Sequence, residues 1–114
     1  MPAADVEVKL SDTLTVTMRP VNMLEKMTAS VYASALAAKV NAVATTELNL
    51  NAAAICSIRA VNGTKVEPLV NYLNFQAVAQ DIGGAESYTL VDAYITQTGL
   101  GVEKEAGNAA PSAS

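Results

Sequence analysis

The sequence contains no histidine and no tryptophan, and it has only one cysteine, Cys56, and one phenylalanine, Phe75. Without histidine, the chain has no imidazole that could act as a general base or a zinc ligand. Catalytic arrangements of the Ser-His-Asp and Cys-His kinds are therefore excluded within one chain. Because a single cysteine cannot form an intrachain disulfide, a disulfide scaffold is also excluded, and a reducing compartment is favoured.

Basic residues are scarce and scattered. Seven Lys and Arg against eleven Asp and Glu give a formal net charge of −4, and no window of the sequence is strongly basic. Nucleic acids and anionic membrane surfaces are bound by clustered cations, so neither is an expected partner. Acidic residues occupy the N-terminal region where a signal peptide would be apolar, and no uncharged run approaches the roughly 20 residues that span a bilayer. We therefore expect neither a secretion signal nor a membrane span.

Large apolar side chains are few, although 51% of the 114 residues are hydrophobic. Much of that fraction is alanine, which buries little surface. A chain of this length builds one core, and we expect a single domain over residues 1–98. Residues 99–114 are rich in Gly, Ala and Ser without an apolar period, which predicts a flexible tail. A thin core predicts marginal stability and a partner surface that adds burial.

The clearest local pattern lies in residues 6–18. Apolar residues alternate with polar ones on both sides of a polar break at 11–13: Val6, Val8, Leu10, Leu14, Val16 and Met18. This period of two predicts a β-hairpin with one buried face. Since a lone hairpin is barely stable in water, helices are expected to cover that face.

A first helix is expected from Asn22 to Ala44, because Asn22 and Glu25 have the spacing of a capping box. The helix could be interrupted near residues 29–30. Its second half, residues 33–46, is rich in small side chains and would form either a close helix contact or a mobile stretch. A second, buried helix is expected to begin at Asn49 or Asn51 and to run through Ile58. Arg59 would then lie at its C-terminal end, where a cation favours the helix dipole.

Two shorter helices complete the expected fold. Asn62-Gly63 predicts a turn, Asn74 is expected to cap a helix that stops at Gly83-Gly84, and Ser87 is expected to cap a last helix ending at Gly99. The sequence therefore predicts an α+β fold, with an N-terminal β-hairpin packed on about four α-helices and a disordered C-terminal tail.

No residue carries a strong signal for chemistry. Cys56 could act as a nucleophile or redox sensor, but its apolar neighbours favour a core residue. The acidic residues lack calcium-loop spacing and fall mainly at caps, turns and solvent faces. Gly83-Gly84 lacks the Lys-Ser ending of a phosphate-binding loop. We therefore expect no enzyme activity, no cofactor and no metal, and we assign no catalytic, cofactor-binding or metal-binding residue.

Tyrosine and methionine are the remaining candidates, because both are common in adaptable protein interfaces. Each could also simply fill the core. The hypothesis for a partner-binding face comprises five residues: Met23, Met27, Tyr32, Tyr88 and Tyr94.

The order of these features resembles small bacteriophage tail proteins, chiefly the tail assembly chaperones, and is also similar to the small baseplate-hub proteins of contractile tails. The resemblance covers about residues 6–98. It depends on a hairpin followed by five short segments: Arg19-Pro20-Val21-Asn22, Leu24-Glu25-Lys26-Met27, Ala53 to Gly63, Asn74-Phe75 and Ile82-Gly83. Its motifs are a pattern of apolar positions, the Asn62-Gly63 turn after an apolar helix, and Gly83.

This resemblance implies a non-enzymatic role in tail morphogenesis, with tape-measure, tail-tube or baseplate-hub proteins as partners. A chaperone would keep the tape-measure protein soluble in the host cytoplasm during assembly. The alternatives are a structural baseplate or tail subunit retained in the virion, and a small regulatory adaptor unrelated to tails. A second copy of the chain, in a homo-oligomer, is a further candidate partner.

Overall fold

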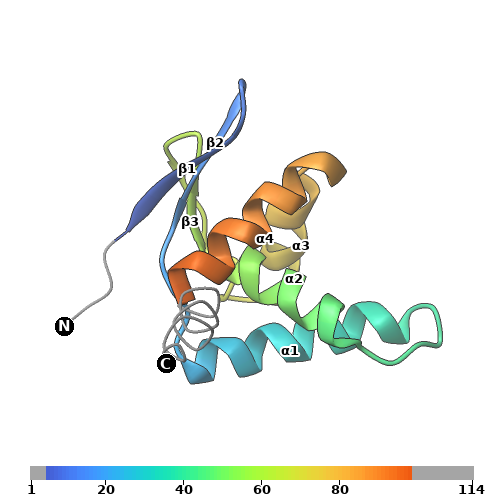
Figure 1. Ribbon diagram of the computed structural model, residues 1–114. Coiled ribbons are helices and arrows are strands. Elements are labelled where there is room, and N and C mark those ends of the chain that lie inside the picture. The colour runs from blue at the N-terminus through green and yellow to red at the C-terminus, as the bar shows by residue number, and fades with distance from the viewer. Residues whose placement is uncertain (1–4, 99–114) are drawn as a thin grey trace, which may run out of the picture.

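The computed structural model describes residues 5–98, and these form an α+β fold (Figure 1). The elements in chain order are β1 (Val6–Ser11), β2 (Leu14–Met18), α1 (Met23–Ala38), α2 (Thr46–Cys56), β3 (Ile58–Val61), β4 (Thr64–Lys65), α3 (Tyr72–Gln80) and α4 (Gly84–Thr98). The predicted fold class is confirmed, but the sheet is larger than the expected hairpin. The tail at 99–114 and the expected helix end at Gly99 lie outside the described residues.

The sheet has four antiparallel strands in the order β1-β2-β3-β4. The predicted hairpin is confirmed, with Val8 opposite Val16. A second hairpin, β3-β4, turns at Asn62-Gly63, where φ is 49° and 83°. Two successive residues with positive φ are what a tight two-residue hairpin turn requires. The Asn-Gly signal located the turn, although the strands on either side of it were not expected.

Asn62 ties the two hairpins together at one end of the sheet. Its side-chain oxygen accepts a hydrogen bond from the Thr15 backbone nitrogen at 2.8 Å, and its amide nitrogen donates to the Thr13 carbonyl at 3.1 Å. Its own backbone nitrogen donates to the Thr15 carbonyl at 2.7 Å. The turn residue therefore also fixes the β1-β2 turn.

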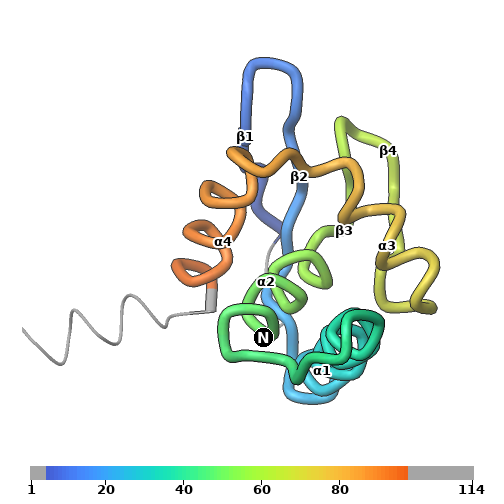
Figure 2. Tube along the Cα trace, turned by 90° about the vertical axis from the view of Figure 1, so that its right-hand side faces the viewer, coloured from blue at the N-terminus to red at the C-terminus, as the bar shows by residue number. Residues whose placement is uncertain are grey.

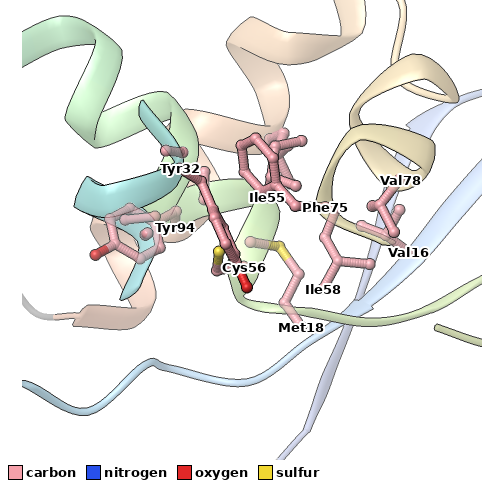
Figure 3. Close-up of a cluster of buried hydrophobic side chains, with 14 of the residues drawn as sticks. Val16, Met18, Tyr32, Ile55, Cys56, Ile58, Phe75, Val78 and Tyr94 are labelled. Carbon is pink, nitrogen blue, oxygen red and sulfur yellow. The ribbon is translucent and has the colours of Figure 1, made fainter. Parts of the chain in front are cut away.

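The core lies between the inner face of the sheet and the helices (Figure 3). Val16 and Met18 of β2 and Ile58 of β3 are completely buried, as the alternation in β2 predicts. Phe75 and Val78 of α3 and Leu90 and Tyr94 of α4 close the core from the other side. Only a few large side chains fill it, in line with the composition.

Helix α2 is the centre of the molecule, because it contacts α1, α3, α4 and β3. Figures 1 and 2 both place α2 between α1 and α4. The side of α1 that faces α2 consists of Ala29, Ala33 and Ala37, which recur every four residues and are at most 5% exposed. Small side chains at this spacing let two helices approach closely. The first part of the 33–46 segment is therefore a close helix contact.

Helix α1 begins as predicted and ends earlier than predicted. Asn22 and Glu25 form the capping box, with each side chain accepting the other's backbone N–H. The helix continues through 29–30 without a break and stops at Ala38 rather than Ala44. Asn41 has a φ of 57°, and the Ala42 nitrogen donates to the Ala37 carbonyl at 2.9 Å. An asparagine in this left-handed conformation is a common helix stop.

The predicted starts of the three later helices are wrong. Thr45 caps α2 by accepting from the Leu48 nitrogen, in place of Asn49 or Asn51. Asn71 caps α3 by accepting from the Asn74 nitrogen. The two true caps lie just ahead of the first helical residue, whereas the expected caps Asn49, Asn51 and Asn74 are polar residues within the first two turns.

Helix α4 begins at Gly84, three residues before the expected cap Ser87. The Gly83 nitrogen donates to Glu86 Oε1 at 2.8 Å, so a glutamate side chain satisfies the backbone ahead of the helix. Helix α3 ends at Gln80, ahead of the expected stop at Gly83-Gly84, and the glycine pair instead lies at the start of α4.

Arg59 is not at a helix end. Helix α2 stops at Cys56, and both Ile58 and Arg59 belong to β3. The Arg59 guanidinium lies 3.3 Å from Glu25 Oε2, with the two side chains 20% and 28% exposed. Glu25 thus caps α1 and connects it to the sheet.

Candidate protein-binding surface

The side of α1 that faces away from α2 is apolar and exposed. Met23, Leu24, Met27 and Val31 are 58–71% exposed, and they lie on one side of the helix because they recur at helical spacing. We call these four residues the α1 outer face. Figure 1 shows α1 along the lower edge of the molecule, with α2 on its other side.

No charge interrupts this surface beyond the first turn of the helix. Between Met27 and Ala38, α1 contains no Asp, Glu, Lys or Arg. Its inner side is already buried against α2, and its exposed side combines the four large apolar residues with the small polar residues Ser30 and Ser34. Contiguous exposed apolar surface marks interaction sites. The α1 outer face is therefore the strongest candidate binding surface in residues 5–98.

The loop after α1 adds two more exposed apolar side chains. Val40 and Val43 are 75% and 87% exposed. Lys39, the first cation after the helix, lies with its ammonium 5.2 Å from the centroid of the Tyr72 ring, on the side of α3.

The five residues of the predicted partner-binding face do not form one surface. Met23 and Met27 lie on the α1 outer face, and Tyr88 lies on α4 with an exposure of 80%. The surface placement of Tyr32 and Tyr94 is wrong, since they are 8% and 1% exposed. The Tyr32 ring lies 5.0 Å from the Phe75 ring between centroids, and its hydroxyl donates to the Leu69 carbonyl at 3.2 Å. Burial of both phenols raises their pKa values.

Two residues of the surface were missed. Leu24 and Val31 follow the same helical spacing as Met23 and Met27. Extending that spacing along the helix would have found them. Tertiary packing was needed to show which side of α1 meets α2.

Cys56 lies in the core. Its side chain is inaccessible to solvent, and burial raises the pKa of the thiol to about 12. The thiol is therefore protonated at neutral pH, which is the state of an unreactive core cysteine rather than of a nucleophile.

A groove of about 610 Å³ lies beside β2 and β3 and is also lined by Lys65, Val66, Glu67, Leu69 and Val70. Its charges are largely paired. Asp5 accepts from Arg19 at 2.6 Å, which lowers the pKa of Asp5, and Glu25 accepts from Arg59. These pairs connect the start of β1, the end of β2, α1 and β3, so they serve the fold.

Acidic residues do not gather into a metal site: residues 5–98 hold no group of three or more Asp, Glu, Cys or His side chains placed to hold an ion. None of the described helices is both long enough and apolar enough to cross a bilayer. Comparison with protein-family models, with curated proteins and with solved structures finds no significant match to this chain.

Proposed function

We propose that this protein is a non-enzymatic factor of bacteriophage tail morphogenesis, of the tail-assembly-chaperone type, and that it binds an apolar helical segment of a tail protein on the α1 outer face. The observation that carries the proposal is the exposure of Met23, Leu24, Met27 and Val31 on a helix whose opposite side is fully packed. The phage context comes from the sequence resemblance. The apolar face supports the binding mode.

The partner chemistry follows from the surface. A single helix presenting an uncharged apolar stripe is complementary to the apolar face of another helix, as in other helix-recognition modes. Methionine side chains are flexible and polarizable, so Met23 and Met27 can adapt to clients of different shape. A tape-measure protein, being long and helical, would offer such faces repeatedly.

The size of the surface favours reversible binding. Fully burying one such side chain contributes about 1.5–3 kcal/mol, and association costs at least about 4 kcal/mol in lost freedom of motion. Four side chains that are already partly covered leave a modest net affinity. A chaperone that hands its client on to an assembling tail needs affinity of this order, whereas a permanent subunit would need a larger interface.

The decisive experiment is co-purification of the tagged protein from phage-infected cells, with mass spectrometry of the bound proteins and of finished particles. We expect a tape-measure or tail-tube protein in the bound fraction and none of the tagged protein in particles. Retention in particles at fixed copy number would show that the protein is a structural subunit rather than a chaperone. Binding of no phage protein would refute the role in tail assembly.

Paired variants locate the surface. Met27→Asp/Val31→Asp should reduce client recovery at least tenfold, because it places two charges on the α1 outer face. Val70→Asp/Leu73→Asp is the matched control, since these apolar side chains are 62% and 74% exposed and do not belong to α1. Both variants should keep the far-ultraviolet circular dichroism of the parent. Equal loss of client in both variants would contradict a site on α1.

A further inference from the structure

A second surface lies on the other side of α2, where α2 and α4 enclose a groove of about 350 Å³. Apolar side chains of both helices line it: Leu50, Val91 and Ile95. Tyr88 stands beside them with 80% of its surface exposed. Because α1 and α4 lie on different sides of α2 (Figure 2), this groove is separate from the α1 outer face.

The charges around the groove are of one sign. Glu47 in the first turn of α2 and Asp92 in α4 both line it. Across the described parts of both helices, every charged side chain is a carboxylate, the third being Glu86. Neither Glu47 nor Asp92 forms an ion pair within residues 5–98. Lys26 lines a neighbouring hollow on the α1 side instead.

Each feature fits one part of a long basic side chain. A lysine or arginine covers apolar surface with its methylene stem and keeps its charged head at the rim. The groove offers apolar side chains for the stem, two carboxylates for the head and an exposed tyrosine ring for cation–π contact. Glu47 also favours the α2 dipole, but Asp92 is in the middle of α4 and has no such role.

We propose that the α2-α4 groove binds a basic amphipathic helix of a partner protein, with Lys or Arg side chains of that helix between Glu47 and Asp92. The choice of a basic partner follows from charge complementarity, which sets specificity and association rate more than affinity. This site is independent of the α1 outer face, so the protein can contact two partners on different sides of α2.

The test uses a synthetic 18-residue helical peptide with a leucine stripe flanked by lysines, and a reference peptide with glutamate in place of every lysine. Fluorescence anisotropy measures binding to the full chain. The lysine peptide should bind with a micromolar Kd that rises with salt, and the glutamate peptide should bind at least tenfold more weakly. Glu47→Gln/Asp92→Asn should weaken binding of the lysine peptide at least tenfold.

Two controls make the result specific. Glu7→Gln/Asp81→Asn removes the same charge from exposed positions on β1 and after α3, and it should change the Kd by less than twofold. Met27→Asp/Val31→Asp should likewise retain binding through the groove. The proposal is overturned if the wild-type chain does not bind the lysine peptide, if the two charge-removal pairs weaken it equally, or if the α1 variant alone abolishes it.

Discussion

Asn62 combines a backbone role with a side-chain role. Its φ of 49° places it in the left-handed region, and its side chain makes two hydrogen bonds to the β1-β2 turn. A turn residue that only reversed the chain could be replaced by glycine at little cost. Here glycine would keep the turn and lose the connection between the hairpins.

We predict that Asn62→Ala lowers the free energy of unfolding by about 2 kcal/mol or more, because it loses both hydrogen bonds and because alanine tolerates positive φ less well than asparagine does. Asn62→Gly should cost less, since it loses the hydrogen bonds only. Urea unfolding followed by circular dichroism measures both. Equal destabilisation by the two substitutions would show that backbone strain contributes nothing here.

The Glu25 carboxylate accepts two hydrogen bonds. Its Oε1 accepts from the Asn22 backbone nitrogen at 2.9 Å, and its Oε2 accepts from the Arg59 guanidinium. Glu25→Gln keeps the capping geometry and removes the charge that Arg59 faces. We predict a loss of about 1 kcal/mol for Glu25→Gln and about 2–3 kcal/mol for Glu25→Ala. Chemical denaturation distinguishes them, and a Gln variant as unstable as the Ala variant would assign the whole effect to the ion pair.

At the scale of the elements, the α1-α2 contact depends on side chains that are small. Ala29, Ala33 and Ala37 are buried, while the large apolar side chains on the opposite side of α1 are exposed to solvent. One helix therefore carries a tight intramolecular contact and an intermolecular candidate surface, on opposite sides.

This arrangement gives a paired prediction. Ala33→Leu should destabilise the fold by about 1–3 kcal/mol, because the added atoms force α1 away from α2. Ala38→Leu makes the same chemical change at an exposed position of the same helix and should stay within about 0.5 kcal/mol. Thermal unfolding of both variants is the measurement. A stable Ala33→Leu variant would mean that the contact is looser than its burial indicates.

The elements also show what could be predicted from the sequence. The β1-β2 hairpin and the start of α1 were predictable because alternation and a capping box are local patterns. Strand β3 was not, because Ile58 follows the apolar C-terminal part of α2, residues 52–56, with only Ser57 between them. Nothing local marks the change from helix to strand. The partner face mixed buried with exposed tyrosines, because burial is decided by tertiary neighbours such as Phe75.

For the molecule as a whole, stability should fall at acid pH. The Ser11 side chain and the Gly83 N–H lower the pKa of Glu86, and Arg19 lowers the pKa of Asp5. A carboxylate whose pKa is lower in the folded state contributes stability above its unfolded pKa of about 4. That contribution is lost as the pH falls through the folded value. Glu86→Gln should therefore flatten the dependence of the melting temperature on pH below about 4, and an unchanged dependence would exclude Glu86 as its source.

At alkaline pH the folded state binds more protons than the unfolded state, which is the reverse of the situation at acid pH. Burial raises the pKa of Cys56 from 9.0 to about 12, so the folded state retains a proton that the unfolded state releases. The contribution is complete below pH 9 and is lost as the pH rises towards 12. Cys56→Ala should reduce the alkaline loss of stability relative to wild type in thermal scans from pH 8 to 11. Labelling of Cys56 by iodoacetamide in the native state would contradict the burial on which this depends.

The hydrogen bonds by which Asn62 connects the two hairpins also affect its chemical modification over time. An asparagine followed by glycine deamidates readily, because the unhindered Gly63 nitrogen can attack the side-chain carbonyl of Asn62 to form a succinimide. In the folded chain that side chain is bonded to Thr13 and Thr15, so cyclisation must wait for the turn to open. Deamidation would then replace the amide donor by a carboxylate facing the Thr13 carbonyl and weaken the connection further. The intact turn therefore protects Asn62 against this damage, and opening of the turn exposes it.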